Sequence, residues 1–432
     1  MKKQARLSRR RFLGDAIGSM GAAMLAPYVI TTNALGAAGI PPASERIVMA
    51  NIGSGGQGRY DTQNFLNLPG VEVVAVCDVD KKMLQKGLNL VNEHYGNQDC
   101  RGYSDFREVL ARSDIDAINI GTVDHWHVLI GIAACRAGKD IYCQKPLSAT
   151  IAEGRAMVEA VNRYRRVLQV GTQQRSEANF RYACELVRNG RIGRLTRIDV
   201  YLPAGPTLNK TPQPQPVPPE LDYEMWQGPA PAHPYCEERV HWNFRWIMDY
   251  TPGMLSDWGA HHIDIAQWGH GTELSGPVEI EGTGYFPPDS LWDAPPTFDV
   301  RYTYSDGVTL RCTTGGNPRI EFFGTEGAVK VARGNWLETT PRSLARSTIA
   351  PGEIHLYESR NHYADFIQCV RSRQQPAAPV EIGHRSVTIC HLGLIACRLG
   401  RKLRWDPQRE AFIGDAEADG LRSRPMRAPW TL

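Results

Sequence analysis

The sequence predicts an α/β chain in which a doubly wound parallel sheet is followed by a second, α+β domain. Three observations support this fold class. A glycine-rich turn, Gly53-Ser54-Gly55-Gly56-Gln57-Gly58, follows a short apolar run at 47–52. Apolar runs and helical patterns then alternate as far as residue 143, which is the order of a parallel sheet. Beyond about residue 171, strand-like runs are separated by turn residues such as Ser305-Asp306-Gly307, which favours antiparallel pairing.

The first 38 residues have the pattern of a targeting segment and are set aside from the fold. The run Ser8-Arg9-Arg10-Arg11-Phe12-Leu13 has the form of a twin-arginine export leader, an apolar stretch follows at 16–26, and small residues at 34–38 suit cleavage. The apolar stretch is shorter than the roughly 20 residues that a membrane-spanning helix needs. We therefore expect an exported, periplasmic protein with no stable membrane span. A retained leader and a disordered basic tail are the alternatives.

Length and composition predict two domains with no affinity for nucleic acid. The 432 residues carry a formal net charge of +3, and the basic residues are scattered without runs, so a nucleic-acid partner is not expected. We expect a first domain at 45–171, a second at 172–404 and an irregular tail at 405–432. The ten cysteines contain no CxxC pair, and Cys77 and Cys143 close apolar runs, which is typical of packed thiols.

The glycine turn predicts a dinucleotide-binding site of the Rossmann type. It lies between a predicted strand at 47–52 and a predicted helix, and a second strand at 71–76 ends close to Asp78. In such a unit the glycines allow the backbone to approach a pyrophosphate at a helix N-terminus. Asp78 would accept hydrogen bonds from the adenosine ribose and repel a 2′-phosphate, so NAD is favoured over NADP. The residues expected to hold the cofactor here are Gly53, Gly55, Gly56, Gln57, Gly58 and Asp78.

Further candidate residues follow the next two predicted strands. The pattern predicts helices at 80–93 and 126–137 and strands at 115–120 and 140–143. Ligands of a doubly wound sheet bind outside the carboxyl ends of its strands. The polar residues at these positions, and hence the further candidates for cofactor contacts, are Thr122, His125, His127, Gln144 and Lys145.

Together these segments resemble the glucose-fructose oxidoreductase and inositol dehydrogenase family (Gfo/Idh/MocA). The resemblance rests on the glycine turn, the strand end at Asp78, the segments 124–127 and 144–147, and the later segment 253–264. It covers nearly the whole chain after the leader. It implies a C-terminal α+β domain with a large, open, mostly antiparallel sheet, which often carries an oligomer interface. It also implies catalytic roles for Lys145, Asp257 and His261. Gln144 departs from the family's usual Glu-Lys-Pro tripeptide.

The three candidate catalytic residues suit the oxidation of a secondary alcohol, which needs a base for the hydroxyl proton as hydride leaves carbon. His261 is the best base, because its ordinary pKa of roughly 6.5 lies close to the working pH. Asp257 lies four residues earlier and, on a helix, could orient His261 or bind a second hydroxyl. Lys145 can stabilise negative charge on the reacting oxygen. Since Gln144 is neutral, we expect the pKa of Lys145 to fall, which makes Lys145 a second candidate base.

The second half of the chain offers candidate substrate contacts. A helix is expected at 173–188, strands at 195–202, 298–304, 308–313 and 320–323, and helices at 361–370 and 386–399, with a proline-rich loop at 211–219. Five of the ten tryptophans fall between Trp226 and Trp268, where aromatic rings could wall a sugar pocket or pack in the core. The candidate substrate contacts are Arg175, Arg245, Trp258 and His262.

A catalytic metal is not expected. His125-x-His127 and His261-His262-x-Asp264 could supply ligands in principle, but the sequence has no thiolate pattern and no HExxH spacing. His127 and His262 could equally be packed core histidines.

Three functions remain open at this level. The first is an NAD(P)-dependent oxidoreductase acting on a sugar, sugar derivative or glycoside, with a tightly bound cofactor that it carries through export. The second is a glycoside hydrolase or lyase that uses bound NAD for transient oxidation followed by elimination. The third is a non-catalytic sugar-binding protein, which the presence of Lys145, Asp257 and His261 disfavours.

Overall fold

Residue 42 and residues 45–432 are described by the computed structural model. The predicted leader at 1–38 lies outside the described residues. Residues Ile47–Leu432 form one compact unit that contains two sheets.

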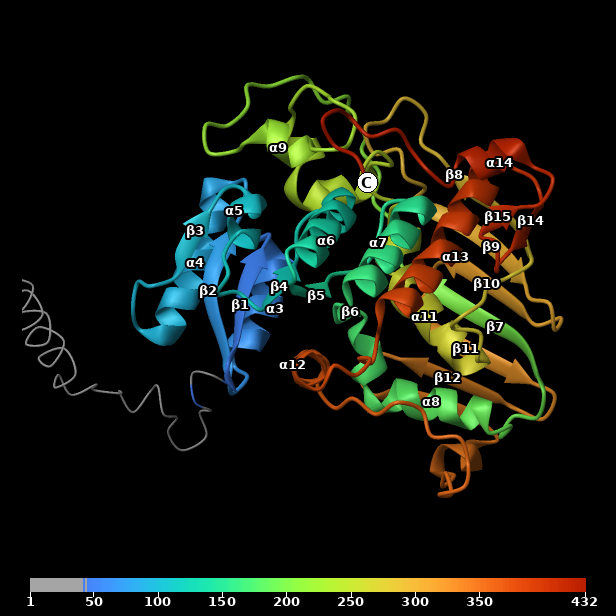
Figure 1. Cartoon of the computed structure of the whole chain (residues 1–432). Coiled ribbons are helices and arrows are strands. Elements are labelled where there is room, and N and C mark those ends of the chain that lie inside the picture. The colour runs from blue at the N-terminus through green and yellow to red at the C-terminus, as the bar shows by residue number, and fades with distance from the viewer. Residues whose placement is uncertain (1–41, 43–44) are drawn as a thin grey trace, which may run out of the picture. The chain divides into compact units, whose positions relative to one another are not determined.

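The first sheet has six parallel strands in the order β3-β2-β1-β4-β5-β6 (Figure 1). This is the doubly wound order in which the strand sequence reverses between β1 and β4, so the carboxyl ends of those two strands border the ligand crevice. The strands are β1 (Ile47–Ile52), β2 (Val71–Cys77), β3 (Arg101–Tyr103), β4 (Ala117–Ile120), β5 (Asp140–Cys143) and β6 (Leu168–Val170).

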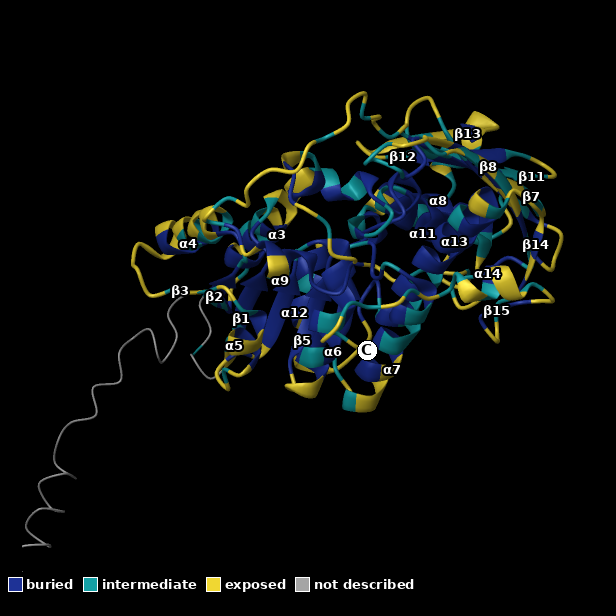
Figure 2. Cartoon of the chain, turned by 90° about the horizontal axis from the view of Figure 1, so that it is seen from above, coloured by how far each residue is buried: buried dark blue, intermediate teal, exposed yellow. Residues whose placement is uncertain are grey.

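Helices connect these strands and cover both faces of the sheet, and β1, β4 and β5 are buried between them (Figure 2). Three of the helices begin at side-chain caps: Asp80 accepts hydrogen bonds from the amides of Lys82 and Met83, Asp105 accepts one from the amide of Arg107, and Thr150 accepts one from the amide of Glu153. The helices are α3 (Gly56–Leu66), α4 (Lys81–Tyr95), α5 (Phe106–Leu110), α6 (His127–Arg136) and α7 (Ile151–Tyr164).

The second sheet has nine strands in the order β13-β12-β11-β7-β10-β9-β8-β14-β15. All its pairings are antiparallel except β10 with β7, which run parallel. The strands are β7 (Leu195–Leu202), β8 (Glu279–Tyr285), β9 (Thr297–Thr303), β10 (Thr309–Thr314), β11 (Arg319–Gly324), β12 (Ala328–Ala332), β13 (Trp336–Thr340), β14 (Leu403–Asp406) and β15 (Ala411–Phe412). The predicted combination of a parallel sheet and a mostly antiparallel sheet is confirmed.

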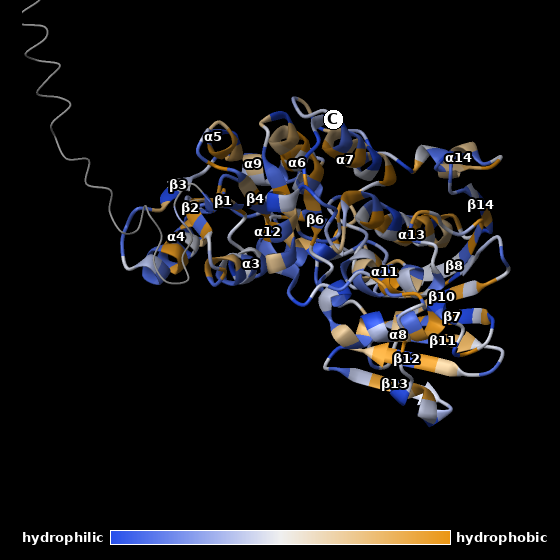
Figure 3. Ribbon diagram, turned by 60° about the horizontal axis from the view of Figure 1, so that its bottom comes forward, coloured by the Kyte–Doolittle hydropathy of each residue, from blue (hydrophilic) through white to orange (hydrophobic). Residues whose placement is uncertain are grey.

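One face of the second sheet packs on helices and forms the largest core of the protein. Alternate residues of its strands, such as Ile320 and Phe322 on β11, are fully buried there, and β12 is strongly apolar (Figure 3). The covering helices are α8 (Ala178–Arg188), α11 (Gly259–His270) and α13 (Val380–Leu399). Helix α13 also contacts α7, so it joins the packing of the two sheets.

Two C-terminal segments pack in places that the sequence did not indicate. Helix α12 (His362–Ser372) lies against α3, where Phe366 and Tyr363 contact Phe65. The tail was expected to be irregular from residue 405, and this is wrong for its first part. Trp405 is buried in the second core, and β15 and α14 (Ala416–Gly420) follow it, because burial of Trp405 and Phe412 draws this segment onto the sheet edge.

Candidate active site

The glycine turn joins β1 to α3 and contains two kinds of glycine. Gly53 has φ +93°, and a Cβ there would lie 2.5 Å from the backbone nitrogen of Thr122. A Cβ on Gly58 would lie 1.9 Å from the carbonyl oxygen of Gly53. Gly55 and Gly56 instead have open space at the Cβ position, at the uncapped N-terminus of α3. Gly53 and Gly58 are therefore needed for close packing, and Gly55 and Gly56 leave room for a ligand beside free helix amides.

Asp78 follows β2 and lies beside the glycine turn, as expected for a ribose contact. Its carboxylate accepts hydrogen bonds from the amides of Ser54, at 2.7 Å, and Asp80, at 2.9 Å. Burial raises the pKa of Asp78 to about 6, although these two amides act in the opposite direction. The carboxylate is thus placed and ionised at neutral pH.

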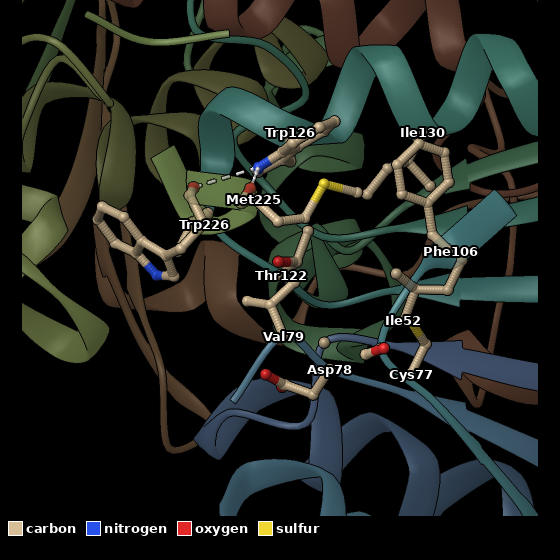
Figure 4. A pocket seen from close by; sticks show the side chains of 13 residues that line it. Ile52, Cys77, Asp78, Val79, Phe106, Thr122, Trp126, Ile130, Met225 and Trp226 are labelled. Carbon is tan, nitrogen blue, oxygen red and sulfur yellow. Dashed lines mark hydrogen bonds between the residues drawn. The ribbon is translucent and has the colours of Figure 1, made fainter. Parts of the chain in front are cut away.

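An apolar pocket opens next to Asp78 (Figure 4). Phe106, Trp126 and Ile130 form one wall, and Met225 comes from the second half of the chain. The indole of Trp126 donates hydrogen bonds to the carbonyls of Met225 and Trp226, which holds this later segment over the pocket. The apolar lining and the position beside Asp78 suit a planar base such as adenine. Phe106 and Met225 could not be identified from the sequence, since neither lies in a recognisable motif.

A second, larger cleft of about 310 Å³ runs from Gly55 and Gly56 to the ends of β4 and β5. Arg59 and Lys86 line it beside the glycine turn, and Lys145 and Asp257 line it farther along. The cleft therefore connects a phosphate-binding type of backbone with the candidate catalytic residues. The predicted cofactor residues among those that line it are Gly53, Gly55, Gly56, Gln57, Asp78, Thr122, Gln144 and Lys145.

Lys145 and Asp257 form an ion pair between the two halves of the molecule. Lys145 Nζ lies 2.5 Å from Asp257 Oδ1 and also donates to the Asp257 carbonyl at 3.0 Å. Arg245 Nε lies 3.7 Å from the same carboxylate oxygen. Burial by itself would raise the pKa of Asp257, but the charges of Lys145 and Arg245 outweigh it and lower that pKa. Gln144 is neutral, so the carboxylate partner of Lys145 is Asp257.

His261 lies close to this pair but on a separate helix. Asp257 ends α10 (Met254–Asp257), Trp258 breaks the helix, and α11 begins at Gly259. The Asp257 carboxylate faces Lys145, so the expected orientation of His261 by Asp257 is not what the hydrogen bonds show. Burial, together with the charges of Lys145 and Arg333, holds the pKa of His261 well below its ordinary value. His261 is therefore neutral at physiological pH, and the expectation from the sequence that its pKa lies close to the working pH is wrong, because burial and nearby cations make it a weaker base.

Arg333 was not identified from the sequence. It lies in the turn between β12 and β13, with its guanidinium carbon 4.7 Å from the ring centroid of Trp258. Gln174 connects it to the catalytic helix: the amide oxygen accepts from Arg333 Nε, and the amide nitrogen donates to the His261 carbonyl, both at 3.0 Å. The only feature of the sequence that marks the position of Arg333 is the Arg-Gly-Asn turn at 333–335.

Gln144 belongs to a buried polar network behind Lys145. Its amide donates to Asp61 Oδ2 at 2.8 Å, and Gln57 and Tyr363 donate to Asp61 Oδ1 at the same distance. Burial raises the pKa of Asp61 to about 7, against the effect of these hydrogen bonds. Asp61 was missed because a carboxylate inside a helix usually faces solvent.

Other predicted site residues do not line the cleft. His125 Nε2 lies 2.9 Å from the Trp226 carbonyl, and the ring of His127 lies between the carbonyls of Pro146, at 2.8 Å, and Thr122, at 3.2 Å. Both are buried, and burial lowers the pKa of His125 to about 3. His127 thus ties together the loops after β4 and β5.

The placement of Arg175 differs most from expectation. It is 3% exposed and forms ion pairs with Asp264, at 2.6 Å, and Glu273, at 2.8 Å. Its Nε, Nη1 and Nη2 atoms all donate to these two carboxylates. Arg175 therefore supports the fold and does not line the cleft. His262 is also fully buried, against Trp258, and burial lowers its pKa to about 3.

The aromatic segment is a mixture of core and cleft wall, as the sequence indicated. Tyr223, Tyr250 and Trp246 are buried in the cores. Trp242, by contrast, is 66% exposed, lines the cleft and lies 3.7 Å from the guanidinium carbon of Arg245.

All ten cysteines are free thiols, and nine of them are buried. Across residue 42 and residues 45–432, no group of three or more His, Cys, Asp or Glu is arranged to hold a metal ion. Over the same residues, none of the helices combines the length and the apolar character needed to cross a bilayer.

Comparisons with known proteins agree with this geometry. Residues 47–172 match the model described as "Oxidoreductase family, NAD-binding Rossmann fold", and residues 206–432 match "Oxidoreductase family, C-terminal alpha/beta domain" of the same GFO_IDH_MocA family. The chain is 24% identical over 355 residues to myo-inositol 2-dehydrogenase of Thermotoga maritima, covering 78% of this chain and 92% of that protein.

Two further similarities are more limited. A glycosyl hydrolase family 109 protein of Shewanella pealeana is 25% identical over 164 residues, which are 36% of this chain and 35% of that protein. The crystal structure of aldose-aldose oxidoreductase from Caulobacter crescentus has the same fold, with a TM-score of 0.63 and 18% identity, over 83% of this chain and 99% of that one.

The two kinds of glycine lead to different expected effects of alanine. Gly58→Ala should lower both the melting temperature and NAD affinity, since its Cβ would meet the Gly53 carbonyl at 1.9 Å. Gly56→Ala should fold normally but weaken NAD binding about tenfold or more, because its methyl group would occupy the ligand space. Thermal melts and calorimetric NAD titrations measure both effects, with the exposed Gly352→Ala as control. Unchanged NAD affinity in Gly56→Ala would contradict the assignment of the space beside Gly55 and Gly56 to the cofactor.

Asp61 should make the protein less stable as pH rises. Its pKa is about 7 in the folded protein and ordinarily 3.8, so between these values only the folded state holds the proton, and stability falls with increasing pH. Asp61→Asn should therefore show a smaller loss of unfolding free energy between pH 5 and pH 8, measured by urea denaturation. The control Asp114→Asn removes an exposed carboxylate whose pKa is lowered by Arg112. An identical pH dependence in Asp61→Asn and wild type would disprove this role.

Proposed function

The chain belongs to the Gfo/Idh/MocA oxidoreductase family, and from this premise we propose that it oxidises or reduces a hydroxyl or carbonyl group of a sugar, sugar derivative or glycoside with a tightly held NAD. The observation that carries the proposal is the Lys145–Asp257 ion pair beside His261, at the far end of the cleft that begins at the glycine turn.

The cleft and pocket fit NAD. The open Cβ positions of Gly55 and Gly56 leave space for a pyrophosphate, Asp78 lies where a ribose would be bound, and the apolar pocket beside it fits adenine. A carboxylate at this position disfavours a 2′-phosphate, which supports NAD over NADP. When bound, NAD supplies the hydride acceptor or donor of the reaction.

His261 is proposed as the group that accepts the hydroxyl proton during oxidation. Its lowered pKa keeps the ring free of a proton across the neutral range. The same shift makes the ring hold an accepted proton less tightly than an ordinary histidine would. His261 Nδ1 has no hydrogen-bond partner among the described residues, but it is buried and His261 does not line the cleft. The proposed proton transfer therefore requires the substrate, or a water molecule, to reach this ring from beside Lys145.

Lys145 is proposed to stabilise charge on the reacting oxygen. Its ammonium group is fixed by two oxygen atoms of Asp257 and lines the cleft, so its position requires no rearrangement during reaction. Asp257 acts as the fixed partner of Lys145.

The carbohydrate substrate class is supported by two observations. Proteins similar to this chain include a myo-inositol 2-dehydrogenase and an aldose-aldose oxidoreductase. The cleft itself offers an aromatic ring, Trp242, beside polar side chains, a combination that binds the C–H face and the hydroxyl groups of a sugar.

A transient-redox glycoside hydrolase or lyase is the second candidate, favoured by the similarity to the glycosyl hydrolase family 109 protein. Oxidation at one carbon would acidify a neighbouring C–H bond, elimination would cleave the glycoside, and the hydride would return. The products separate the two candidates, because only the hydrolase yields a cleaved glycoside with no net redox change.

The activity should depend on the ion pair and His261. Protein purified without added cofactor should release NAD on denaturation, identified by mass, and its nicotinamide absorbance should change when sugars are added.

Asp257→Asn and Lys145→Met should lower kcat/KM about 100-fold or more, while the surface variant Lys402→Met should not. Because the pKa of His261 is lowered, the acid limb of the pH profile should lie below pH 6.5. A protein that takes up neither NAD nor NADP would refute both candidate reactions, and full turnover by Lys145→Arg would exclude Lys145 as the base.

We also propose export to the periplasm by the twin-arginine route, supported by the pattern at residues 8–13. This route carries folded proteins, which would let the enzyme take its cofactor with it. Replacing Arg9 and Arg10 together by lysine should remove the protein from the periplasmic fraction, as measured by immunoblotting after cell fractionation. The single change Arg6→Lys is the control and should leave export intact, and export of the double variant would contradict the route.

Association through the second sheet is proposed as well. The sheet face opposite the core carries ion pairs such as Arg311–Asp299 and Lys330–Glu338, which could face a second copy of the chain. Light scattering of the purified protein tests this, and a monomeric mass would contradict it.

A further inference from the structure

Arg245 is a cation at the reaction centre with no acceptor for its hydrogen bonds. A guanidinium group has five N–H donors, yet Arg245 donates none of the hydrogen bonds found among the described residues, and its Nη1 is buried without a partner. Its nearest carboxylate oxygen is that of Asp257, 3.7 Å from Nε, and Lys145 already binds this oxygen at 2.5 Å. A buried donor without an acceptor costs about 1–3 kcal/mol, so a structure keeps one only where something else compensates.

Several other partly or fully buried arginines have carboxylate partners, whereas Arg239 donates only to the Tyr250 hydroxyl and has a buried Nε without an acceptor. Arg175 binds Asp264 and Glu273, Arg155 binds Glu381 and Glu410, and Arg424 binds Glu153. Arg245 differs from Arg239 in its position, because of the two only Arg245 lines the cleft. Because Arg245 lines the cleft together with Lys145 and Asp257, the missing acceptor is expected on a ligand.

The charges closest to Asp257 also favour an anionic ligand. Two cations, Lys145 and Arg245, lie within 4 Å of the Asp257 carboxylate, an excess of one positive charge among these three groups. The other carboxyl group that lines the cleft near Lys145 is Asp124, and burial raises its pKa, which favours its neutral form. Arg333 is a further cation that interacts with Asp257, and Glu177 is its additional anionic partner. Arg59 and Lys86 supply separate cations beside the glycine turn, where phosphates would bind.

Trp242 fixes the orientation of Arg245. The guanidinium carbon lies 3.7 Å from the Trp242 ring centroid, and Trp242 is 66% exposed at the edge of the cleft. A guanidinium whose face lies on an aromatic ring directs its N–H groups sideways, parallel to the ring, where they can bind a carboxylate through two parallel hydrogen bonds. The aromatic surface beside it can contact the C–H face of a sugar.

We propose that the substrate is an acidic sugar, a uronic or aldonic acid or a glycoside of one, whose carboxylate binds to Arg245. This inference rests on the proposed sugar oxidoreduction and names the substrate class of that same site. The carboxylate would satisfy the unpaired donors of Arg245 and neutralise the excess charge beside Lys145. The hydroxyl that reacts would then lie at Lys145 and His261.

The test compares sugars that differ only in the carboxylate. Glucuronate is paired with glucose and galacturonate with galactose, and each is added to NAD-loaded protein while nicotinamide reduction and calorimetric binding are measured. For at least one pair, the acid should show a Kd and a KM about tenfold or more below those of its neutral partner, which is the range of a hydrogen bond to a charged group. Arg245→Gln should abolish this preference, and Arg245→Lys, which keeps the charge but not the paired donors, should retain part of it. Arg360→Gln, an exposed arginine, is the matched control and should leave the preference unchanged.

The outcomes separate the inference from the proposed function. Equal or better binding and turnover of the neutral sugars would overturn the acidic-sugar inference and leave the oxidoreductase proposal standing. Binding of acids that depends on Arg245, without nicotinamide reduction, would support the inference and contradict the oxidoreductase proposal. If no acid binds and no sugar is oxidised, both are wrong. The acid-to-neutral comparison on the wild-type protein holds even if the Arg245 variants fail to fold.

Discussion

The ion pair between Lys145 and Asp257 connects the end of a strand in the parallel sheet with the end of a short helix beside the second sheet. The two side chains are 14% and 15% exposed, and the lysine also donates to the aspartate carbonyl. Removing either partner would leave the other charge poorly solvated, which is costly in a partly buried site. The cleft, the placement of Arg245 and the electrostatic environment of His261 all depend on this contact.

Burial and charge act in opposite directions on the two carboxylates near this pair. The pKa of Asp257 is lowered because Lys145 and Arg245 outweigh its burial, whereas burial dominates at Asp61 and raises its pKa to about 7. Gln144 lies between them, bonded to Asp61 and adjacent in sequence to Lys145. A neutral amide at this position allows a buried carboxyl group to approach the site without adding a second full negative charge beside the ion pair.

Much of the fold and part of the site could be predicted from the sequence. Period-two and period-3.6 patterns, together with the glycine turn, identified β1, β2, β5 and the parallel order of the first sheet. Asp78 was placed correctly beside the glycine turn because the spacing in such a unit is set by one helix and one strand. Arg333, Asp61 and Met225 could not be found this way, because their proximity to the site comes from contacts between segments far apart in the chain.

Sequence alone was enough to place the glycine turn, the strands and helices around it and the residue types present for hydride-transfer chemistry. These are local properties of backbone preference and hydrophobic period. Three features came only from the tertiary structure: Asp257 pairs with Lys145, Arg175 pairs with a buried carboxylate, and Arg245 has a buried nitrogen, Nη1, without a hydrogen-bond partner among the described residues. The reason is physical: burial and pairing of a charge depend on what surrounds it in three dimensions, and a linear pattern contains no record of those neighbours.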